Sequence, residues 1–344
     1  MLLTQREASI LNAVIRSYII TGEPVGSKAL RDAQSMNLSP ATIRAAMNRL
    51  CELGLLEQPH TSAGRIPTAA GYRYFIENLL PNCRLPQAIK DQIDSIFPHC
   101  AQQPDSLVED SCEALAELTG CAALLTTPAD REAYIKSVRL MQVSRHTAIL
   151  VLLTSSGMMK SRIFRFELPV SSALLEKIDA VLRQEVYNLP LDELNPVMMQ
   201  GLLLTLGEDS LAAAPAISAL MDAANDIAES QIKLKGETNL LTHREFSAER
   251  AKMLFDYLQN DLALLHILRR TGDGLSIILG NETGEDALNS SGMIVTHYSI
   301  GDRDVGAIGI LGPDRMDYEH IIPSVLYFKD KLGGLLTERF SDDF

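Results

Sequence analysis

The side chains best suited to do chemistry lie on one face of a predicted short helix. In the run SPATIRAAMNRLCELG, which begins at residue 39, this face carries small residues and hydrogen-bonding groups: Ala41, Arg44, Ala45, Asn48, Arg49 and Glu52. Arginine and asparagine are among the side chains that read base edges in the DNA major groove. We expect base contacts from four residues: Ala41, Arg44, Ala45 and Asn48. The alternative is an ordinary amphipathic helix, since an arginine on an exposed face is usually only solvated.

The opposite face of this helix anchors it. Ile43, Met47 and Leu50 recur at spacings of four and three residues, so they form one inward stripe. Ser39 is a good N-cap, and Pro40 suits the first helical position, where no N–H is needed. The helix is therefore expected to pack through its apolar stripe and to present the donor-rich face outward.

A hairpin is expected directly after the helix. Residues 55–59 (LLEQP) can form one strand, residues 60–64 (HTSAG) a turn, and residues 65–67 (RIP) the return strand. Arg65 then stands where such a hairpin meets phosphate or the minor groove. We expect contacts with the DNA backbone, or a place in the hairpin, for eight residues: Lys28, Ser39, Thr42, Arg49, His60, Thr61, Ser62 and Arg65.

Two further helices are predicted before this segment. A T-x-x-E capping box begins the first at Thr4, and a TGEP turn ends it. A second, shorter helix reaches about Gln34. The order helix, short helix, turn, helix and hairpin is that of a winged helix-turn-helix. We assign this domain to residues 1–84 and a linker to residues 85–104, because prolines mark the exit from the last helix.

The charge of the chain is distributed unevenly. The net charge is -13 over 344 residues. Residues 1–80 contain eight Lys and Arg against six Asp and Glu, or +2, so the remaining residues carry 23 against 38, or -15. Polyanion binding is thus expected only at the N-terminal end. A module of charge +2 neutralises few phosphates, so two copies acting together are expected to bind more tightly than one.

Composition sets limits on class and location. Hydrophobic residues make up 46% of the chain, which is long enough for two or three domains. The longest apolar runs, such as Ala148–Leu153, are too short to span a bilayer, and the N-terminus lacks the order of a signal peptide. We therefore expect a cytoplasmic protein without membrane contact. The five cysteines are odd in number and contain no Cys-x-x-Cys pair, which argues against a disulfide framework or a zinc site.

No pattern in the body of the chain indicates catalysis. The seven histidines are scattered and form no i, i+4 metal-binding pair. The glycines at 272, 274, 280 and 284 match no phosphate-binding loop, so they are expected in turns, with a small-molecule pocket as the alternative. We expect no enzyme activity, no metal and no cofactor.

The body has β-rich segments on both sides of a helical block. Strands are predicted near residues 121–126, 135–142, 148–153 and 158–166, and again near 275–280, 292–298 and 305–311. A mainly helical stretch lies between the two groups, and an amphipathic helix ends the chain. This order favours one α+β domain divided by an insertion.

Three strings in the N-terminal domain resemble one family. YIITGEPVGSKAL from residue 18, SPATIR from residue 39 and PHTSAGRIPTAAGYR from residue 59 are similar, in this order and spacing, to the HrcA family of bacterial heat-inducible transcription repressors. GPDRMDYEHII from residue 312 is similar to the closing segment of that family. Two positions depart from the family pattern: Ala45 replaces the usual asparagine, and Cys51 the usual glutamate.

The resemblance implies both an architecture and a function. It implies a GAF-like α+β domain, here residues 105–187 and 248–344, interrupted by an inserted, mainly helical dimerisation domain at residues 188–247. It further implies a homodimer that binds an inverted-repeat operator on double-stranded DNA upstream of heat-shock chaperone operons. Release on heat stress, and modulation by the GroEL chaperonin, belong to the same expectation.

The sequence leaves two alternatives open, one for the function of the body and one for the cause of heat release. The body could bind a metabolite and make the protein a metabolite-gated winged-helix transcription regulator. Heat release could also come from marginal stability of the dimer itself, rather than from loss of chaperonin.

Overall fold

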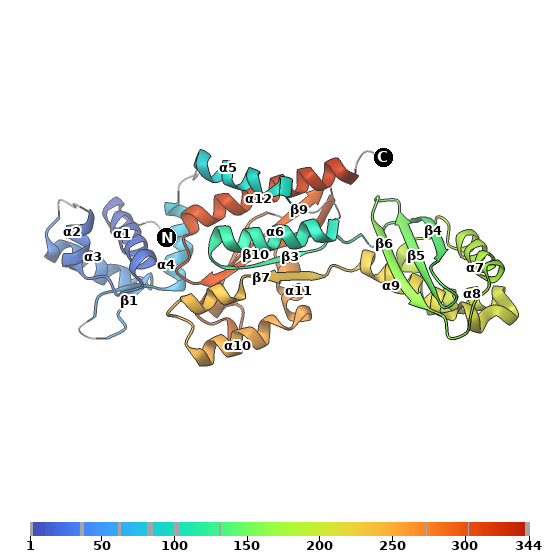
Figure 1. The fold of residues 1–344 in the computed structure, drawn as a ribbon. Coiled ribbons are helices and arrows are strands. Elements are labelled where there is room, and N and C mark those ends of the chain that lie inside the picture. Colours follow the sequence, from blue (N-terminus) through green and yellow to red (C-terminus); the bar gives the residue numbers. More distant parts are fainter. Residues whose placement is uncertain are drawn as a thin grey trace.

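Three parts of the molecule follow one another along its long axis (Figure 1). They are an N-terminal module, a central body and an inserted unit. The structure is a computed structural model and describes residues 3–34, 38–60, 63–80, 85–99, 104–130, 132–272, 274–301 and 303–340. Helices and strands occur together, so the fold class is α+β. Within these residues, no helix is long and apolar enough to cross a membrane.

The N-terminal module consists of short helices and one small hairpin. Its elements are α1 (Gln5–Thr21), α2 (Ser27–Gln34), α3 (Pro40–Glu52), β1 (Leu56–Glu57), β2 (Ile66–Pro67), α4 (Ala69–Tyr74) and the π-helical turn η1 (Phe75–Leu79). Thr4 and Glu7 form the expected capping box of α1, and Gly22, with a φ of 64°, ends it. In the antiparallel hairpin, Leu56 lies opposite Pro67.

A five-stranded antiparallel sheet forms the centre of the body. The strand order is β7-β3-β10-β9-β8. The strands are β3 (Ala122–Thr126), β7 (Ile232–Lys235), β8 (Ser276–Leu279), β9 (Ser291–Ile300) and β10 (Arg303–Pro313). Since β8 pairs only with β9, it lies at one edge of the sheet.

Helices cover both faces of this sheet (Figure 1). One face packs against α6 (Pro104–Thr119) and α12 (Tyr318–Phe340). The other face packs against α10 (Ala248–Leu258) and α11 (Asp261–Arg270). Alternate residues of the strands point to opposite faces, so that Leu125 belongs to the first core and Leu124 to the second.

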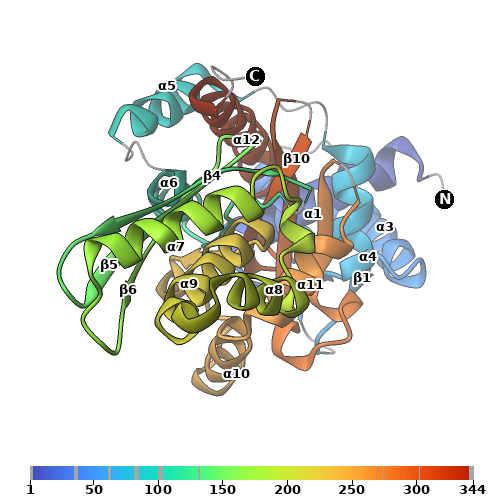
Figure 2. The same ribbon diagram turned by 90° about the vertical axis from the view of Figure 1, so that its right-hand side faces the viewer.

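The inserted unit has its own sheet and its own core. Its elements are β4 (Ile135–Gln142), β5 (Thr147–Thr154), β6 (Met159–Arg165), α7 (Ser172–Glu185), α8 (Pro196–Leu206) and α9 (Ser210–Ala228). The three strands form a separate antiparallel sheet in the order β4-β5-β6, one face of which is covered by the helices (Figure 2). The chain leaves and re-enters the body at one point, where the Thr127 N–H donates to the Gln231 carbonyl oxygen at 2.8 Å.

The limits of this unit differ from the expected 188–247. Strands β4 to β6 and helix α7, which we had expected in the first half of the body, share one buried cluster with α8 and α9. Residues 232–235 instead form β7 of the body sheet. Helices α7, α8 and α9 contain more residues than the three strands of the unit, but the complete sheet was not part of the expectation. The positions of strands can be predicted from local patterns, but the choice of pairing partner is a long-range property that these patterns do not contain.

The segment expected as a linker, residues 85–104, contains an ordered helix in its described part. Helix α5 (Gln87–Ile96) packs beside α12, where Lys331 and Asp94 form an ion pair of 2.9 Å. The ring centroids of Phe97 and Phe328 lie 4.9 Å apart. The linker prediction was therefore wrong for residues 87–99, because the flanking prolines masked an amphipathic helix between them.

Candidate nucleic-acid interface

Helix α3 presents the predicted donor-rich face to solvent. Ser39 caps the helix by accepting the Thr42 N–H at 3.1 Å. Ile43, Met47 and Leu50 are buried against α1 and α2, as their spacing predicts. The residues at the other positions of the helix surface are exposed: Ala41, Arg44, Ala45, Asn48, Arg49 and Glu52. Figure 1 places α3 near the end of the molecule away from the inserted unit.

The cationic side chains of this face differ in their pairing. Arg49 forms an exposed ion pair with Glu52 at 2.8 Å, so part of its charge is already neutralised. Arg44 makes no ion pair or side-chain hydrogen bond within the described part of the chain, and the same holds for Lys28 on α2. Arg44 is therefore the cation of α3 that is available for a new partner.

Arg65 lies in the hairpin, directly before β2. Its backbone N–H and carbonyl bond the carbonyl and N–H of Val25, each at 2.9 Å, which ties the hairpin to the segment before α2. Its half-buried guanidinium donates from Nη2 to Asn48 Oδ1 at 2.7 Å. Arg65 thus supports a residue of α3 instead of standing alone on the hairpin.

The close approach of the hairpin to α2 requires glycine at one position. A Cβ atom on Gly64 would lie 2.5 Å from the backbone carbon and oxygen of Val25. Real Cβ atoms do not come this close to backbone atoms, so a larger residue would displace the Arg65 to Val25 bridge. The arrangement of Arg65 and Asn48 follows from this tight packing.

The remaining predicted contacts are divided between capping and the hairpin. Ser39 and Thr42 use their hydroxyls locally, with Oγ and Oγ1 2.8 Å apart. His60 is exposed at the start of the turn. Thr61 and Ser62 lie outside the described residues. The structure therefore groups Arg44, Asn48 and Arg65 at the exposed face of α3.

Sequence reasoning missed a second group of charged residues, which joins the module to the body. Ion pairs cross this junction between Arg16 and Glu319, between Glu23 and Arg244, and between Arg73 and Glu282. Arg315 donates to the Ile19 carbonyl at 3.0 Å and pairs with Glu245. The partners lie about 200 residues or more apart along the chain, except for Glu245, so no spacing pattern could have indicated them. The module is thus held in a defined position on the body.

Asp314 lies beneath this junction in an unusual environment. Its Oδ1 atom is buried without a hydrogen-bond partner among the described residues. Burial raises the pKa of Asp314 from 3.8 to about 7, and the negative charges of Glu245 and Glu282 act in the same direction. Directly beside it, the rings of Tyr72 and Tyr318 pack across the junction, with their centroids 6.0 Å apart.

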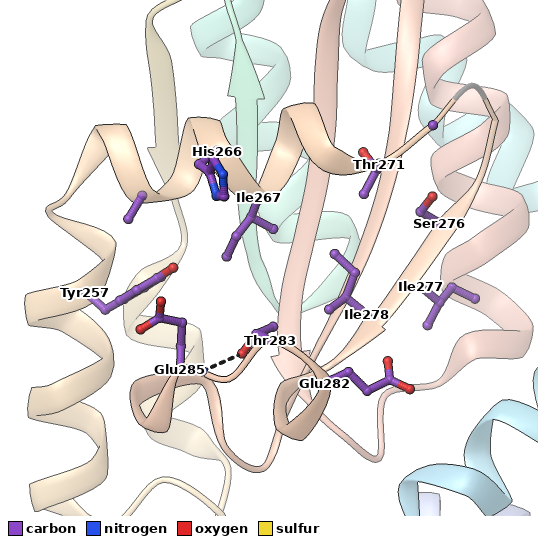
Figure 3. Close-up of a pocket in the computed structure, with 12 residues that line it drawn as sticks. Tyr257, His266, Ile267, Thr271, Ser276, Ile277, Ile278, Glu282, Thr283 and Glu285 are labelled. Atoms are coloured by element: carbon purple, nitrogen blue, oxygen red, sulfur yellow. Dashed lines mark hydrogen bonds between the residues drawn. The ribbon is translucent and has the colours of Figure 1, made fainter.

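A cavity of about 440 Å³ opens beside β8, α10 and α11 (Figure 3). Gly272 of the glycine-rich segment lines it, while Gly284 adopts a φ of 76° in the neighbouring turn. Gly284 thus lies in a turn as expected, and a cavity borders the same segment. That this cavity binds a small molecule stays a prediction. Among the described residues, no three metal-binding side chains come together in one group.

Known proteins similar to this chain cover almost its whole length. Residues 105–322 match the family described as HrcA protein C terminal domain. The heat-inducible transcription repressor HrcA of Clostridium botulinum (strain Alaska E43 / Type E3) is 32% identical over 343 residues, which are 98% of this chain and 99% of that relative. The protein of the same name from Brevibacillus brevis is 29% identical over 340 residues, 98% of this chain and 99% of its own.

One solved structure shares the fold. A crystal structure described as that of a hypothetical protein at 2.2 Å resolution has a TM-score of 0.71 and 23% sequence identity to this chain. The similarity covers 98% of this chain and 100% of that one. The module, body and inserted unit therefore occur together in another protein of the same architecture.

Proposed function

This chain belongs to the HrcA family of heat-inducible transcription repressors, and we propose that it represses heat-shock chaperone operons by binding an inverted-repeat operator as a homodimer. In this proposal residues 1–84 act as a winged helix-turn-helix, and the five-stranded body is a GAF-like domain. The inserted unit, from about residue 128 to 230, carries the dimer contact. The protein acts in the cytoplasm, where bacterial DNA lies, and leaves the operator on heat stress.

One observation carries the DNA-binding part of the proposal. The exposed face of α3 combines small residues with the unpaired Arg44 and with Asn48, and a hairpin lies directly beside it. A helix of this kind fits the major groove, where an arginine binds the O6 and N7 atoms of guanine. Arg44 and Asn48 are assigned to base edges, with Ala41 and Ala45 making close contact. Lys28 and Arg49 are assigned to phosphates.

The outer face of the inserted sheet supports the dimer. Six residues of β4, β5 and β6 on the face away from the helices are apolar: Met141, Ile149, Val151, Leu153, Met159 and Ile163. They form two rows, between which Arg139 and Ser161 flank Val151. Ile163 is 74% exposed and Met159 62%. Exposed apolar residues grouped on one face are typical of an interaction surface. We assign this face to a second copy of this chain, because two half-sites require two modules and each module has a charge of only +2.

Heat release is proposed to depend on chaperonin supply. A body divided by an insertion has long-range strand pairings, such as that of β3 with β7 and β10, which form slowly and leave apolar edges exposed meanwhile. GroEL would then maintain the active repressor until unfolded proteins draw it away. Marginal stability of the dimer itself is the rival cause.

The cavity beside β8 favours a second candidate function. Its volume is within the range of small-molecule sites, and it borders the ion pair of Arg73 and Glu282 that joins module and body. A metabolite bound there would make the protein a metabolite-gated regulator of the same DNA-binding kind.

Replacement of Arg44 tests the main proposal. Fluorescence anisotropy with an inverted-repeat duplex and a scrambled duplex gives the ratio of specific to non-specific affinity. Arg44→Ala should lower this ratio by about 5- to 150-fold, because one base-edge contact contributes about 1–3 kcal/mol. Arg145→Ala, an exposed arginine of the inserted unit, is the matched control and should leave it unchanged. An unchanged ratio in Arg44→Ala would show that α3 does not read sequence through this residue.

A further inference from the structure

The cavity beside β8 has the lining of a small-molecule site. Ile267 and Ile278 form an apolar floor between α11 and the edge strand, while Ile277 lies on the opposite face of β8 (Figure 3). Four residues with hydroxyl groups also line the cavity: Tyr257, Thr271, Ser276 and Thr283. The hydroxyls of Thr271 and Thr283 donate to backbone carbonyls of their own segments. An apolar floor with a few polar groups directed toward it binds molecules that have an apolar body and a polar end.

The charge of the lining favours a cation. Its twelve residues include two carboxylates, Glu282 and Glu285, and one imidazole, His266, but no lysine or arginine. The carboxylate of Glu285 has no hydrogen bond or ion pair among the described residues, and in Figure 3 it lies beside the Tyr257 ring. Burial, and then the charge of Glu285, raise the pKa of Tyr257, so the phenol stays neutral. A carboxylate next to an aromatic ring is a common recognition element for ammonium and guanidinium groups.

The other carboxylate of the lining is shared with the N-terminal module. Arg73 of α4 donates to Glu282 from Nε at 3.0 Å and from Nη2 at 2.5 Å. Arg73 Nη2 also donates to the carbonyl of Ile277 at 3.2 Å. Burial alone would raise the pKa of Glu282, but the bonds from Arg73 and from the Leu279 N–H outweigh it and lower the pKa. One wall of the cavity is thus part of the junction.

We propose that this cavity binds a small organic cation, an ammonium or guanidinium group on a short apolar chain, and that the bound cation competes with Arg73 for Glu282. Glu285 and Tyr257 hold one charged end, and Ile267 and Ile278 contact the chain. A second charged end reaches Glu282 and weakens its bond to the module. Binding of the cation and the position of the module are then coupled, and the coupling is reciprocal.

Calorimetric titration of the full chain with agmatine tests the binding step. Agmatine carries a guanidinium and an ammonium group on a four-carbon chain, and adipate is the dianion of similar length. We expect saturable binding of agmatine and none of adipate. Glu285→Gln should weaken agmatine binding by about fivefold, the value of one partly exposed charge pair. Glu249→Gln, an exposed glutamate of α10 outside the cavity, is the control that should bind as the parent does.

Arg73→Ala tests the competition. If Arg73 and the cation share Glu282, this substitution should raise the affinity for agmatine about threefold, whereas loss of structure would lower it. The inference is overturned if agmatine shows no saturable heat, if adipate binds equally well, or if Glu285→Gln and Glu249→Gln behave alike.

The effect on DNA rests on the proposed function and is measured separately. Saturating agmatine should weaken operator binding by the same factor by which the operator weakens agmatine binding. If the parent protein binds no operator, the proposed function fails while the calorimetry still decides the cavity. If the operator binds and agmatine binds without affecting it, the competition for Glu282 is refuted.

Discussion

Asn48 is held in a fixed orientation before any DNA arrives. Its Oδ1 atom accepts a hydrogen bond from Arg65 at 2.7 Å, which leaves its amide N–H groups as donors at the surface of α3. A side chain that is already oriented loses less conformational entropy on binding. In the proposed function, Arg65 positions Asn48 for DNA reading, and a direct phosphate contact is not needed to explain its place.

The pair of Arg65 and Asn48 can be measured by a double-mutant cycle. Asn48→Ala and Arg65→Ala should each lower operator affinity, and their effects should be non-additive by about 1 kcal/mol, because each removes the same hydrogen bond. Arg65→Ala keeps the backbone bonds to Val25, so the hairpin should stay in place. The measurement is operator affinity by anisotropy at constant salt.

Asn48→Ala combined with Arg49→Ala is the control cycle. Arg49 pairs with Glu52 and not with Asn48, so these two effects should add. Additive effects in the Arg65 cycle would mean that Arg65 and Asn48 contact DNA independently.

The burial or capping role of a single residue could be predicted where it depends on one helix alone. The stripe of Ile43, Met47 and Leu50 is buried as its spacing predicts, and Ser39 caps α3. The bond between Arg65 and Asn48 could not be predicted, since it depends on how the hairpin lies against α3. Their role in reading DNA stays a prediction.

At the level of elements, the positions of helices and strands along the chain could be predicted better than the pairing of strands into sheets. Helix α3 was expected to begin at Pro40 and does so, and all strands of the body and inserted unit lie near their predicted positions except β7. The division of these strands into two sheets was not predictable, because alternation shows that a strand has a buried face but not which strand lies beside it. Strand β7 was missed since its four residues, IKLK, lie within a helical pattern.

The outer face of the inserted sheet gives a test of the dimer. Ile163→Asp places a charge in the proposed contact, at the end of the row formed with Ile149 and Met141. Burial of an unpaired carboxylate is costly, so the dimer should dissociate at least about tenfold more readily. Sedimentation velocity over a range of protein concentrations measures this change.

Leu168→Asp is the matched control for the dimer test. Leu168 is as exposed as Ile163, at 75%, but lies after β6 and outside the sheet. Its replacement should leave the association unchanged. If both variants associate as the parent does, the second copy does not bind to this face.

For the molecule as a whole, the junction between module and body is the main connection. Buried residues of α1, α3 and α4 belong to the same cluster as residues of α6 and α12. Ion pairs surround this shared core. The position of α3 relative to the body therefore depends on this shared core and on the ion pairs around it.

Asp314 makes the stability of this junction dependent on pH. Its pKa is about 7 in the folded protein and 3.8 as the ordinary value, so between about pH 4 and 7 the folded state keeps a proton that the unfolded state has lost. This contribution to the free energy of unfolding is present in full below pH 4 and is lost as the pH rises through 7. It should amount to a few kcal/mol at most. Asp314→Asn should remove it.

Urea unfolding at pH 5 and pH 8 measures this effect. Between these values the parent should lose more stability than Asp314→Asn does. Asp256→Asn, an exposed aspartate of α10, should behave as the parent. An equal pH dependence in the parent and in Asp314→Asn would show that Asp314 is not the group responsible.

The central claim is that two modules of one dimer read two half-sites. The most direct measurement is binding of the full-length protein to an inverted-repeat duplex and to the same duplex with its half-sites moved by half a helical turn, about 5 base pairs, at two salt concentrations. The respaced duplex should bind at least about tenfold more weakly, because only one module can then engage in register. The salt dependence on the intact duplex should report phosphate contacts from both modules. Equal affinity for the two duplexes, at both salt concentrations, would contradict the account.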